Sequence, residues 1–344
     1  MLNRDLLEYI RVQLQRGLSE GDIRNILADA GWEQSEVNQA VSVSVYEGDY
    51  DIETRDLTKF YGKTRGVLSL DLFVRRGEIF GFLGPNGAGK STTIRLLLRL
   101  IRPSSGSIRI LGQDPQTSYA SILANVGYLP GDVRLYEKMT GRQLLALVRA
   151  YHPGSEITAY GDELVARLEC EIDTPFRKLS KGNKQKLGIL MALSHRPHLV
   201  ILDEPTAGLD PLSQNEFYRI LEDLKREGTT VFFSSHNLPE VDRVCDRVGI
   251  IRDGRMVDVE TIRTLRSHQR KVVEVHFHSP YQREVFDAIH GVEILDANHT
   301  FLRLHATDAA MVELLPLLSR TGGTDVTIAY PDLENVFMKY YGRT

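Results

Sequence analysis

One glycine-rich segment of this 344-residue chain reads Gly84-Pro85-Asn86-Gly87-Ala88-Gly89-Lys90-Ser91-Thr92. It matches the pattern G-x-x-x-x-G-K-[ST], which forms a phosphate-binding loop when a strand precedes it and a helix follows it. The apolar run at 79–83 predicts that strand, and the leucines at helical spacing in 93–100 predict the helix. The segment therefore predicts a binding site for nucleotide phosphates.

Individual residues of this loop have separate predicted roles. Gly84, Gly87 and Gly89 carry no Cβ, so backbone N–H groups can converge on the β-phosphate. Lys90 is expected to neutralise β- and γ-phosphate oxygens, and the Ser91 hydroxyl is expected to ligate Mg²⁺. The alternative is a glycine-rich turn without a ligand. The loop alone does not separate kinases, GTPases and motor proteins, because all of them use it.

Two further apolar segments end in residues that suit phosphate chemistry. Residues 199–202 are followed by Asp203 and Glu204, which is typical of a buried strand whose end points at the nucleotide. Asp203 is predicted to hold Mg²⁺, directly or through water, and Glu204 to act as general base on the attacking water. Residues 229–235 predict another strand, which ends at His236. The alternatives are a solvated carboxylate pair and a purely structural histidine.

A second candidate anion site lies in the segment Leu179-Ser180-Lys181-Gly182-Asn183-Lys184-Gln185. Ser180 is expected to cap the helix that follows, and Gly182 to let backbone N–H groups approach an anion. Two phosphate-binding helix starts in one domain are explained if each γ-phosphate is held between two chains. A capped helix without a ligand is the alternative.

The composition narrows the class of protein. Hydrophobic residues make up 42% and charged residues 26%, which is ordinary for a soluble protein. The net charge of −4 gives no electrostatic reason to expect a nucleic-acid partner. Cys170 and Cys245 have no CxxC spacing, so we predict neither a zinc site nor a disulfide, as in a reducing cytoplasm. The polar N-terminus and the lack of an 18-residue apolar run predict neither a signal peptide nor a membrane span.

Together, these motifs resemble the ATP-binding subunit of ABC transporters, whose signature pattern is L-S-x-G-x-x-Q. The resemblance implies an α/β P-loop NTPase fold, with a RecA-like core and a helical subdomain around 144–168, and it implies ATP and Mg²⁺ as cofactors. It also implies that Tyr61 stacks on adenine, although a half-buried turn position remains open, and that His236 is the switch histidine that contacts the γ-phosphate. The predicted nucleotide-binding residues are Tyr61, Gly84, Pro85, Asn86, Gly87, Ala88, Gly89, Lys90, Ser91, Thr92, Ser180 and Gly182, with Ser91 and Asp203 for the metal and Glu204 and His236 for catalysis.

The resemblance further implies partners and a location. Two copies of the chain would form a homodimer through the ATP sites, with Asp210 at the seam. A separate integral-membrane permease would dock on the helical subdomain, which places the subunit in the cytoplasm at the inner face of the cell membrane. One motif departs from the pattern, because Gly131 stands where the family has a glutamine. In the family, that glutamine links ATP hydrolysis to the membrane subunit. Here either Asp132 or the backbone alone would make this link.

Three regions are expected along the chain. Residues 1–48 predict a small helical module of three helices around Trp32, with Ser19 capping the second helix and a third helix after Ser35. The module resembles a ubiquitin-associated bundle in pattern but is also compatible with a simple docking appendage. Residues 50–265 contain every nucleotide motif, and Asp253-Gly254 near their end predicts a hairpin. Residues 266–344 show the order βαββαβ of a ferredoxin-like domain, with helices predicted at 282–290 and 309–318 and a closing helix at 333–341. Their final segment, 331–342, resembles the tail of drug and antibiotic exporter ATPases.

Our interpretation is an ATP-hydrolysing subunit that powers export of an unidentified substrate. Three alternatives remain. An ABC ATPase of translation or DNA repair usually carries two cassettes or a long coiled-coil insertion. A small-molecule P-loop kinase needs no L-S-x-G-x-x-Q segment. A regulatory module with a vestigial ATPase would not need Asp203, Glu204 and His236.

Overall fold

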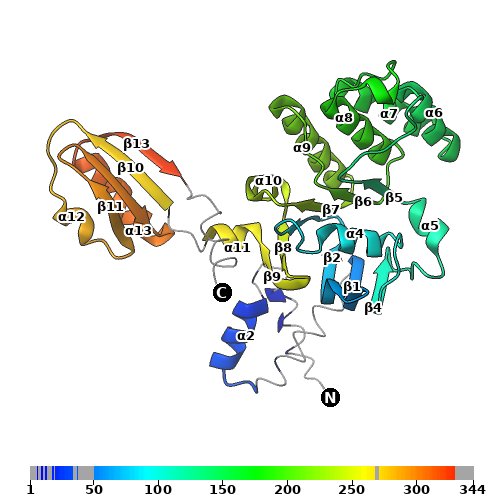
Figure 1. Cartoon of the computed structure of the whole chain (residues 1–344). Coiled ribbons are helices and arrows are strands. Elements are labelled where there is room, and N and C mark those ends of the chain that lie inside the picture. Colours follow the sequence, from blue (N-terminus) through cyan, green and yellow to red (C-terminus); the bar gives the residue numbers. More distant parts are fainter. Residues whose placement is uncertain are drawn as a thin grey trace. The chain divides into compact units, whose positions relative to one another are not determined.

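The computed structural model describes residues 50–267 and 271–329 and, before them, residues 6, 9–10, 12–13, 18, 20–33 and 37. The chain divides into two compact units, Met1–Thr261 and Ile262–Thr344 (Figure 1). The first unit ends before residue 265, where the sequence predicted the boundary, because helix α11 (Ile262–Ser267) groups with the second unit. That residues 1–48 form a separate module stays a prediction.

A six-stranded sheet in the order β5-β6-β7-β3-β8-β9 forms the centre of the first unit. The first five strands run parallel, and β9 pairs antiparallel with β8 through the predicted Asp253-Gly254 turn. Every residue of β3, β6 and β7 is buried, as expected for parallel strands covered on both faces. The strands are β3 (Ile79–Leu83), β5 (Val126–Leu129), β6 (Leu199–Asp203), β7 (Thr230–Ser235), β8 (Arg247–Arg252) and β9 (Arg255–Thr261).

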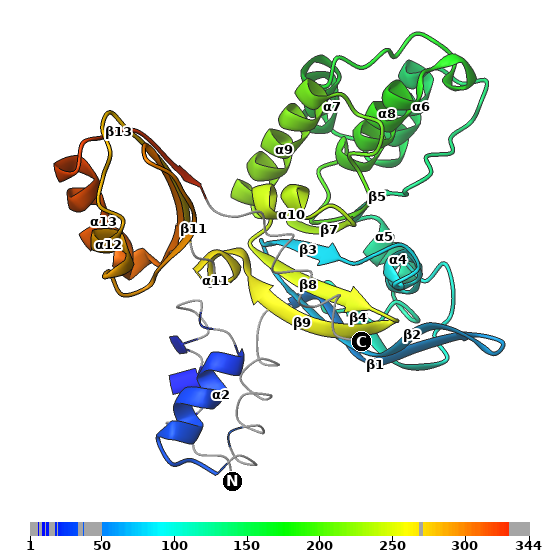
Figure 2. The same cartoon turned by 60° about the vertical axis from the view of Figure 1, so that its left-hand side comes forward.

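A three-stranded antiparallel sheet, in the order β2-β1-β4, covers one side of this centre. Its strands are β1 (Tyr50–Tyr61), β2 (Thr64–Arg75) and β4 (Ser105–Ile110). Helix α4 (Lys90–Leu97) lies between the two sheets (Figure 2). Ile94 and Leu97 of this helix share one hydrophobic core with Leu70 of β2 and Ile201 of β6. This core fixes the start of α4, and with it the phosphate loop, relative to the ends of the parallel strands.

The opposite face of the six-stranded sheet carries helices α8 (Lys181–Leu193), α9 (Pro211–Arg226) and α10 (Leu238–Val244) (Figure 2). Helices α6 (Gly141–Tyr151) and α7 (Ser155–Arg167) pack on α8 and on each other, forming the predicted helical subdomain. A capping box between Thr140 and Gln143 begins α6. The remaining short elements are α5 (Tyr119–Leu123) and a 3₁₀ turn at Phe176–Lys178.

The second unit is a four-stranded antiparallel sheet in the order β11-β12-β10-β13. With α12 and α13 between the strands, it has the βαββαβ order of a ferredoxin-like domain. Helix α12 is shorter than the predicted 282–290, and the predicted helix at 333–341 lies outside the described residues. The elements are β10 (Lys271–Phe277), α12 (Glu284–Asp287), β11 (Val292–Ala297), β12 (Phe301–Ala306), α13 (Asp308–Arg320) and β13 (Gly323–Ala329).

Near the N-terminus, helix α2 (Glu20–Asp29) belongs to a small apolar cluster. Ile23 and Leu27 of α2 are buried with Leu6 and Ile10, and Trp32 packs against them. The predicted cap Ser19 and most of the predicted third helix lie outside the described residues. No helix in the described part of the chain is long and apolar enough to cross a membrane.

Candidate nucleotide site

The glycine-rich segment forms the connection between β3 and α4. Gly87 and Gly89 adopt positive φ angles of 81° and 114°, which glycine tolerates without a steric cost. Lys90 is 6% exposed, and its ammonium donates to the carbonyl oxygens of Gly84 (2.7 Å) and Pro85 (3.2 Å). The loop therefore curls around the lysine, and these carbonyls hold its charge where a phosphate would be bound.

The β8–β9 hairpin packs against the phosphate loop. The backbone N–H of Gly254 donates to the carbonyl of Ala88 at 2.9 Å. A side chain at Gly84 would run into the carbonyl of Ile251, and one at Gly89 would come within 3.0 Å of the Gly66 carbonyl. Neighbouring backbone thus requires glycine at positions 84 and 89, whether or not a ligand is bound.

Asp203, at the end of β6, faces the start of α4. Its Oδ2 accepts a hydrogen bond from Ser91 Oγ at 2.8 Å, and its Oδ1 accepts one from Ser234 Oγ at 2.6 Å. The Asp203 residue is only 6% exposed. A hydroxyl and a carboxylate side by side match the oxygen ligands that Mg²⁺ prefers, so these residues fit the metal.

Glu204 lies between the phosphate loop and His236. Its Oε1 is 3.5 Å from Lys90 Nζ and 3.1 Å from His236 Nδ1. Its backbone has φ +48°, an uncommon left-handed conformation for a residue with a side chain. Its N–H donates to both the carbonyl (3.1 Å) and the hydroxyl (3.2 Å) of Ser234, and these bonds hold the conformation.

Tyr61 ends strand β1, and 44% of its surface is exposed. The Lys59 ammonium lies 5.4 Å from the centre of its ring. A Cβ at Gly66 would lie 3.1 Å from the Tyr61 ring and 3.2 Å from the Thr92 methyl group, so the ring lies beside the first turn of α4. An exposed ring next to the phosphate loop suits stacking on a base.

The signature segment begins helix α8. Ser180 caps it, as predicted, and its hydroxyl accepts from the Asn183 N–H at 3.2 Å. Gly182 has a structural reason of its own, because a Cβ there would lie 2.8 Å from the carbonyl of Gly208. Gln185 donates to the carbonyl of Pro205 at 2.8 Å. Among the hydrogen bonds of the described residues, none joins Ser180 or Gly182 to residues 84–92.

Gly131, which replaces the glutamine of the family pattern, has its backbone next to Asp203. A Cβ at Gly131 would lie 3.4 Å from the Asp203 carbonyl oxygen. The Asp132 side chain is 75% exposed and pairs with Arg134 at 2.8 Å. Of the two alternatives left open by the sequence, this placement favours backbone geometry over the Asp132 carboxylate.

Sequence reasoning missed two residues that hold this site together, Ser234 and Glu240, and it gave Gln185 no contact of its own. Ser234 pairs with Asp203 in the β6–β7 register, so a polar residue at the end of the neighbouring strand was the available signal. Glu240 accepts from Thr206 and Ser235, each at 2.7 Å. Its only sequence signal is its position four residues after His236.

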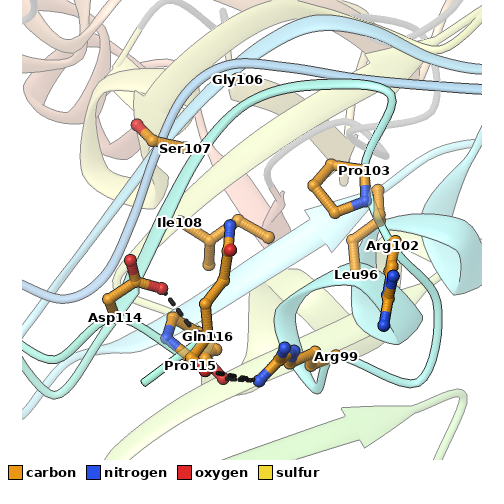
Figure 3. A pocket seen from close by; sticks show the side chains of 10 residues that line it. All are labelled: Leu96, Arg99, Arg102, Pro103, Gly106, Ser107, Ile108, Asp114, Pro115 and Gln116. Atoms are coloured by element: carbon orange, nitrogen blue, oxygen red, sulfur yellow. Dashed lines mark hydrogen bonds between the residues drawn. The ribbon is translucent and has the colours of Figure 1, made fainter. Parts of the chain in front are cut away.

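A separate hollow of about 360 Å³ lies between the end of α4 and strand β4 (Figure 3). Arg99 lines it and donates to the carbonyls of Pro115 (2.7 Å) and Gln116 (2.8 Å). None of its lining residues belongs to the phosphate loop or to the carboxylate pair. The hollow is therefore distinct from the candidate nucleotide site at the phosphate loop and the ends of β6 and β7.

A glycine loop around a buried lysine, a serine beside an aspartate and a glutamate beside a histidine define a P-loop nucleoside triphosphatase. The family described as "ABC transporter" matches residues 67–207. The bacitracin transport ATP-binding protein BcrA of Bacillus licheniformis is 36% identical over 299 residues, covering 85% of this chain and 97% of that protein. The Nod factor export ATP-binding protein I of Sinorhizobium fredii is 33% identical over 309 residues, covering 88% and 89%.

A solved ATP-binding subunit of an ABC transporter superposes with a TM-score of 0.59 at 32% identity, covering 62% of this chain and 91% of that one. The chain belongs to the ABC transporter family, as an ATP-binding subunit that hydrolyses ATP.

Proposed function

We propose that this subunit works as a homodimer at the cytoplasmic face of the cell membrane, where it drives a separate permease that exports a substrate. One relative is named for Nod factor export, which supports the direction, and another is named for bacitracin transport. The observation that carries the proposal is the arrangement of Lys90, Glu204 and His236 around one open site.

The proposed chemistry assigns each side chain a task. Lys90 binds the β- and γ-phosphate oxygens, and Tyr61 supports the base. Ser91 and Asp203 would hold Mg²⁺, which supplies positive charge to the phosphate oxygens. Glu204 accepts a proton from the attacking water, and His236, in contact with Glu204 Oε1, orients that carboxylate and faces the γ-phosphate.

The second chain completes the site in this proposal. The start of α8 presents Ser180 and Gly182 to solvent-accessible space, and the N-terminus of a helix favours an anion. These residues make no hydrogen bond to the phosphate loop within the described part of their own chain, which suits a role at the γ-phosphate of a partner. ATP would then join the two chains, and its hydrolysis would release them and shift the permease between two states.

Purification of the tagged chain from detergent-solubilised membranes tests this function. We expect an integral-membrane protein to co-purify in a fixed ratio, and ATP hydrolysis by the assembly to be lost in Glu204→Gln. Recovery of the chain with ribosomes, or with no membrane protein, would contradict the proposal and favour the translation class of ABC ATPases.

A further inference from the structure

Glu240 of helix α10 connects the loop after β6 to the end of the neighbouring strand β7. Its Oε1 accepts a hydrogen bond from Thr206 Oγ1 at 2.7 Å, and its Oε2 accepts one from Ser235 Oγ at 2.7 Å. The amide of Asn237 lies 3.4 Å from Oε1. Thr206 is 5% exposed and Ser235 1%, so both hydroxyls depend on this carboxylate for a strong acceptor.

The two anchored residues flank the pair proposed for hydrolysis. Thr206 lies two residues after Glu204, and Ser235 lies one residue before His236. One carboxylate therefore holds both chain segments at the point where the Glu204 carboxylate meets the His236 ring, 3.1 Å apart. Within the described residues, no hydrogen bond or ion pair joins Glu240 to Lys90, Ser91 or Asp203.

The segment after Glu204 is also held from the other side. Gln185 of α8 donates to the Pro205 carbonyl at 2.8 Å, and it is 4% exposed. Pro205 and Thr206 are thus fixed between α8 and α10. Such support on both sides is expected where a residue like Glu204 keeps an unfavourable φ of +48°.

We propose that Glu240 is a positioning residue for ATP hydrolysis, which sets the distance between Glu204 and His236 by tying Thr206 to Ser235. This inference rests on the roles proposed for Glu204 and His236. We expect no contact between Glu240 and the nucleotide. Its loss changes the rate of the chemical step through His236 and leaves nucleotide affinity unchanged.

Two substitutions separate hydrogen bonding from charge. Glu240→Ala removes the side-chain acceptor of the Thr206 hydroxyl and leaves the Ser235 hydroxyl only the Asn237 carbonyl at 3.2 Å, so the tie between the two segments is lost. We expect kcat to fall about 10- to 100-fold while KM and the Kd for ATP change less than twofold. Glu240→Gln keeps the length and can bond both hydroxyls, since a hydroxyl both donates and accepts. We expect it to restore most of kcat. The exposed Glu222 of α9 supplies the matched control, Glu222→Ala.

A double-mutant cycle with His236→Ala provides the decisive measurement. If Glu240 acts through His236, the double variant hydrolyses ATP at the rate of His236→Ala alone, within about twofold. Multiplied losses, or a parallel loss of ATP affinity, would overturn the proposal. Thr206→Val removes one of the two bonds at nearly constant volume, and it replaces Glu240→Ala in the cycle if that variant does not fold.

The same assay separates failure of this inference from failure of the proposed function. A Glu204→Gln variant that hydrolyses ATP normally contradicts the proposed chemistry itself. An inactive Glu204→Gln together with a fully active Glu240→Ala contradicts only the positioning role.

Discussion

Ser91 and Asp203 lie 112 positions apart in the chain, and the Ser91 hydroxyl donates to Asp203 Oδ2 at 2.8 Å. The bond joins the first turn of α4 to the end of β6. Since both groups are oxygen ligands suited to Mg²⁺, the bond brings the loop proposed to bind phosphate next to the strand proposed to hold the metal.

We therefore expect Ser91→Ala to lower the affinity of the ATP-bound subunit for Mg²⁺. The Mg²⁺ concentration for half-maximal ATP hydrolysis should rise about tenfold or more, because one ligand is lost and Asp203 loses a partner. A Mg²⁺ titration at saturating ATP measures the change, with the exposed Ser121→Ala as control. An unchanged Mg²⁺ dependence in Ser91→Ala would contradict the prediction that Ser91 is a metal ligand.

Lys90→Ala should abolish useful nucleotide affinity. Its buried ammonium is the cation that the carbonyls of Gly84 and Pro85 hold in the loop, and a charged hydrogen bond contributes about 1.5–3 kcal/mol. Titration with a fluorescent ATP analogue would show a loss of about 10- to 100-fold or more. Lys63→Ala, at an exposed position, should bind as the parent chain does. Equal affinity in both variants would contradict the assignment of the loop.

Glu204→Gln should trap a dimer. The change keeps the size of the side chain but removes the base, so hydrolysis should fall about 10²- to 10⁴-fold while ATP still binds. Light scattering should then report a doubled mass only when ATP is added. Adding Ser180→Arg, which places a large cation at the start of α8, should return the mass to that of a monomer without preventing ATP binding. A double variant that still dimerises would show that Ser180 does not complete a partner's site.

Asp132→Ala distinguishes the two explanations for the missing glutamine. Because the Asp132 side chain points to solvent and pairs with Arg134, we expect the variant to keep permease-stimulated hydrolysis. Gly131→Val, in contrast, places a branched side chain in contact with Asp203 and should lower permease-stimulated hydrolysis. ATPase assays of the assembled transporter measure both. Uncoupled hydrolysis in Asp132→Ala would instead assign the role to its carboxylate.

His195 should make the fold sensitive to acid. Burial, and secondly the neighbouring His152, lower the pKa of His195 to about 4. Between pH 6.5 and 4 the unfolded chain binds a proton that the folded chain does not, so stability contributed by this group is present above pH 6.5 and is lost as the pH falls. Between pH 6.5 and 4 the loss is on the order of 3 kcal/mol.

The comparison of His195→Gln with the parent chain isolates this contribution in urea unfolding at several pH values. Burial raises the pKa of Glu260 to about 7, which acts in the opposite direction because that stability is lost as the pH rises. Glu260 is present in both chains, so the difference between them reports His195. Parallel curves down to pH 4.5 would refute the assignment.

The sequence predicted the elements whose signals are local. The order strand, glycine loop and helix at 79–97 was readable because each part has its own composition. The βαββαβ order of the second unit followed from alternation and helical spacing. Asp203 and Glu204 were readable because two carboxylates ended an apolar run.

What the sequence could not predict depends on contacts between distant segments. Nothing near Glu240 indicates that Thr206 and Ser235 both bond to it, since that requires β6 and β7 to be neighbours. Gly182 was explained by an approaching anion, whereas the structure adds the carbonyl of Gly208 as a steric reason. Helix α12 was overestimated because the apolar spacing in 282–290 says nothing about where the helix must turn.

The contact between Gly182 and the Gly208 carbonyl has a consequence for redesign. A Cβ at Gly182 would lie 2.8 Å from the Gly208 carbonyl, and Gly208 itself has a φ of +84°, so a side chain at either position is strained. We expect that a chain redesigned to recognise a different dimer partner must receive both segments from the same donor protein. A graft of α8 alone would bring a foreign surface against Gly208, and the misfit would spread along Pro205 and Thr206 to Glu204.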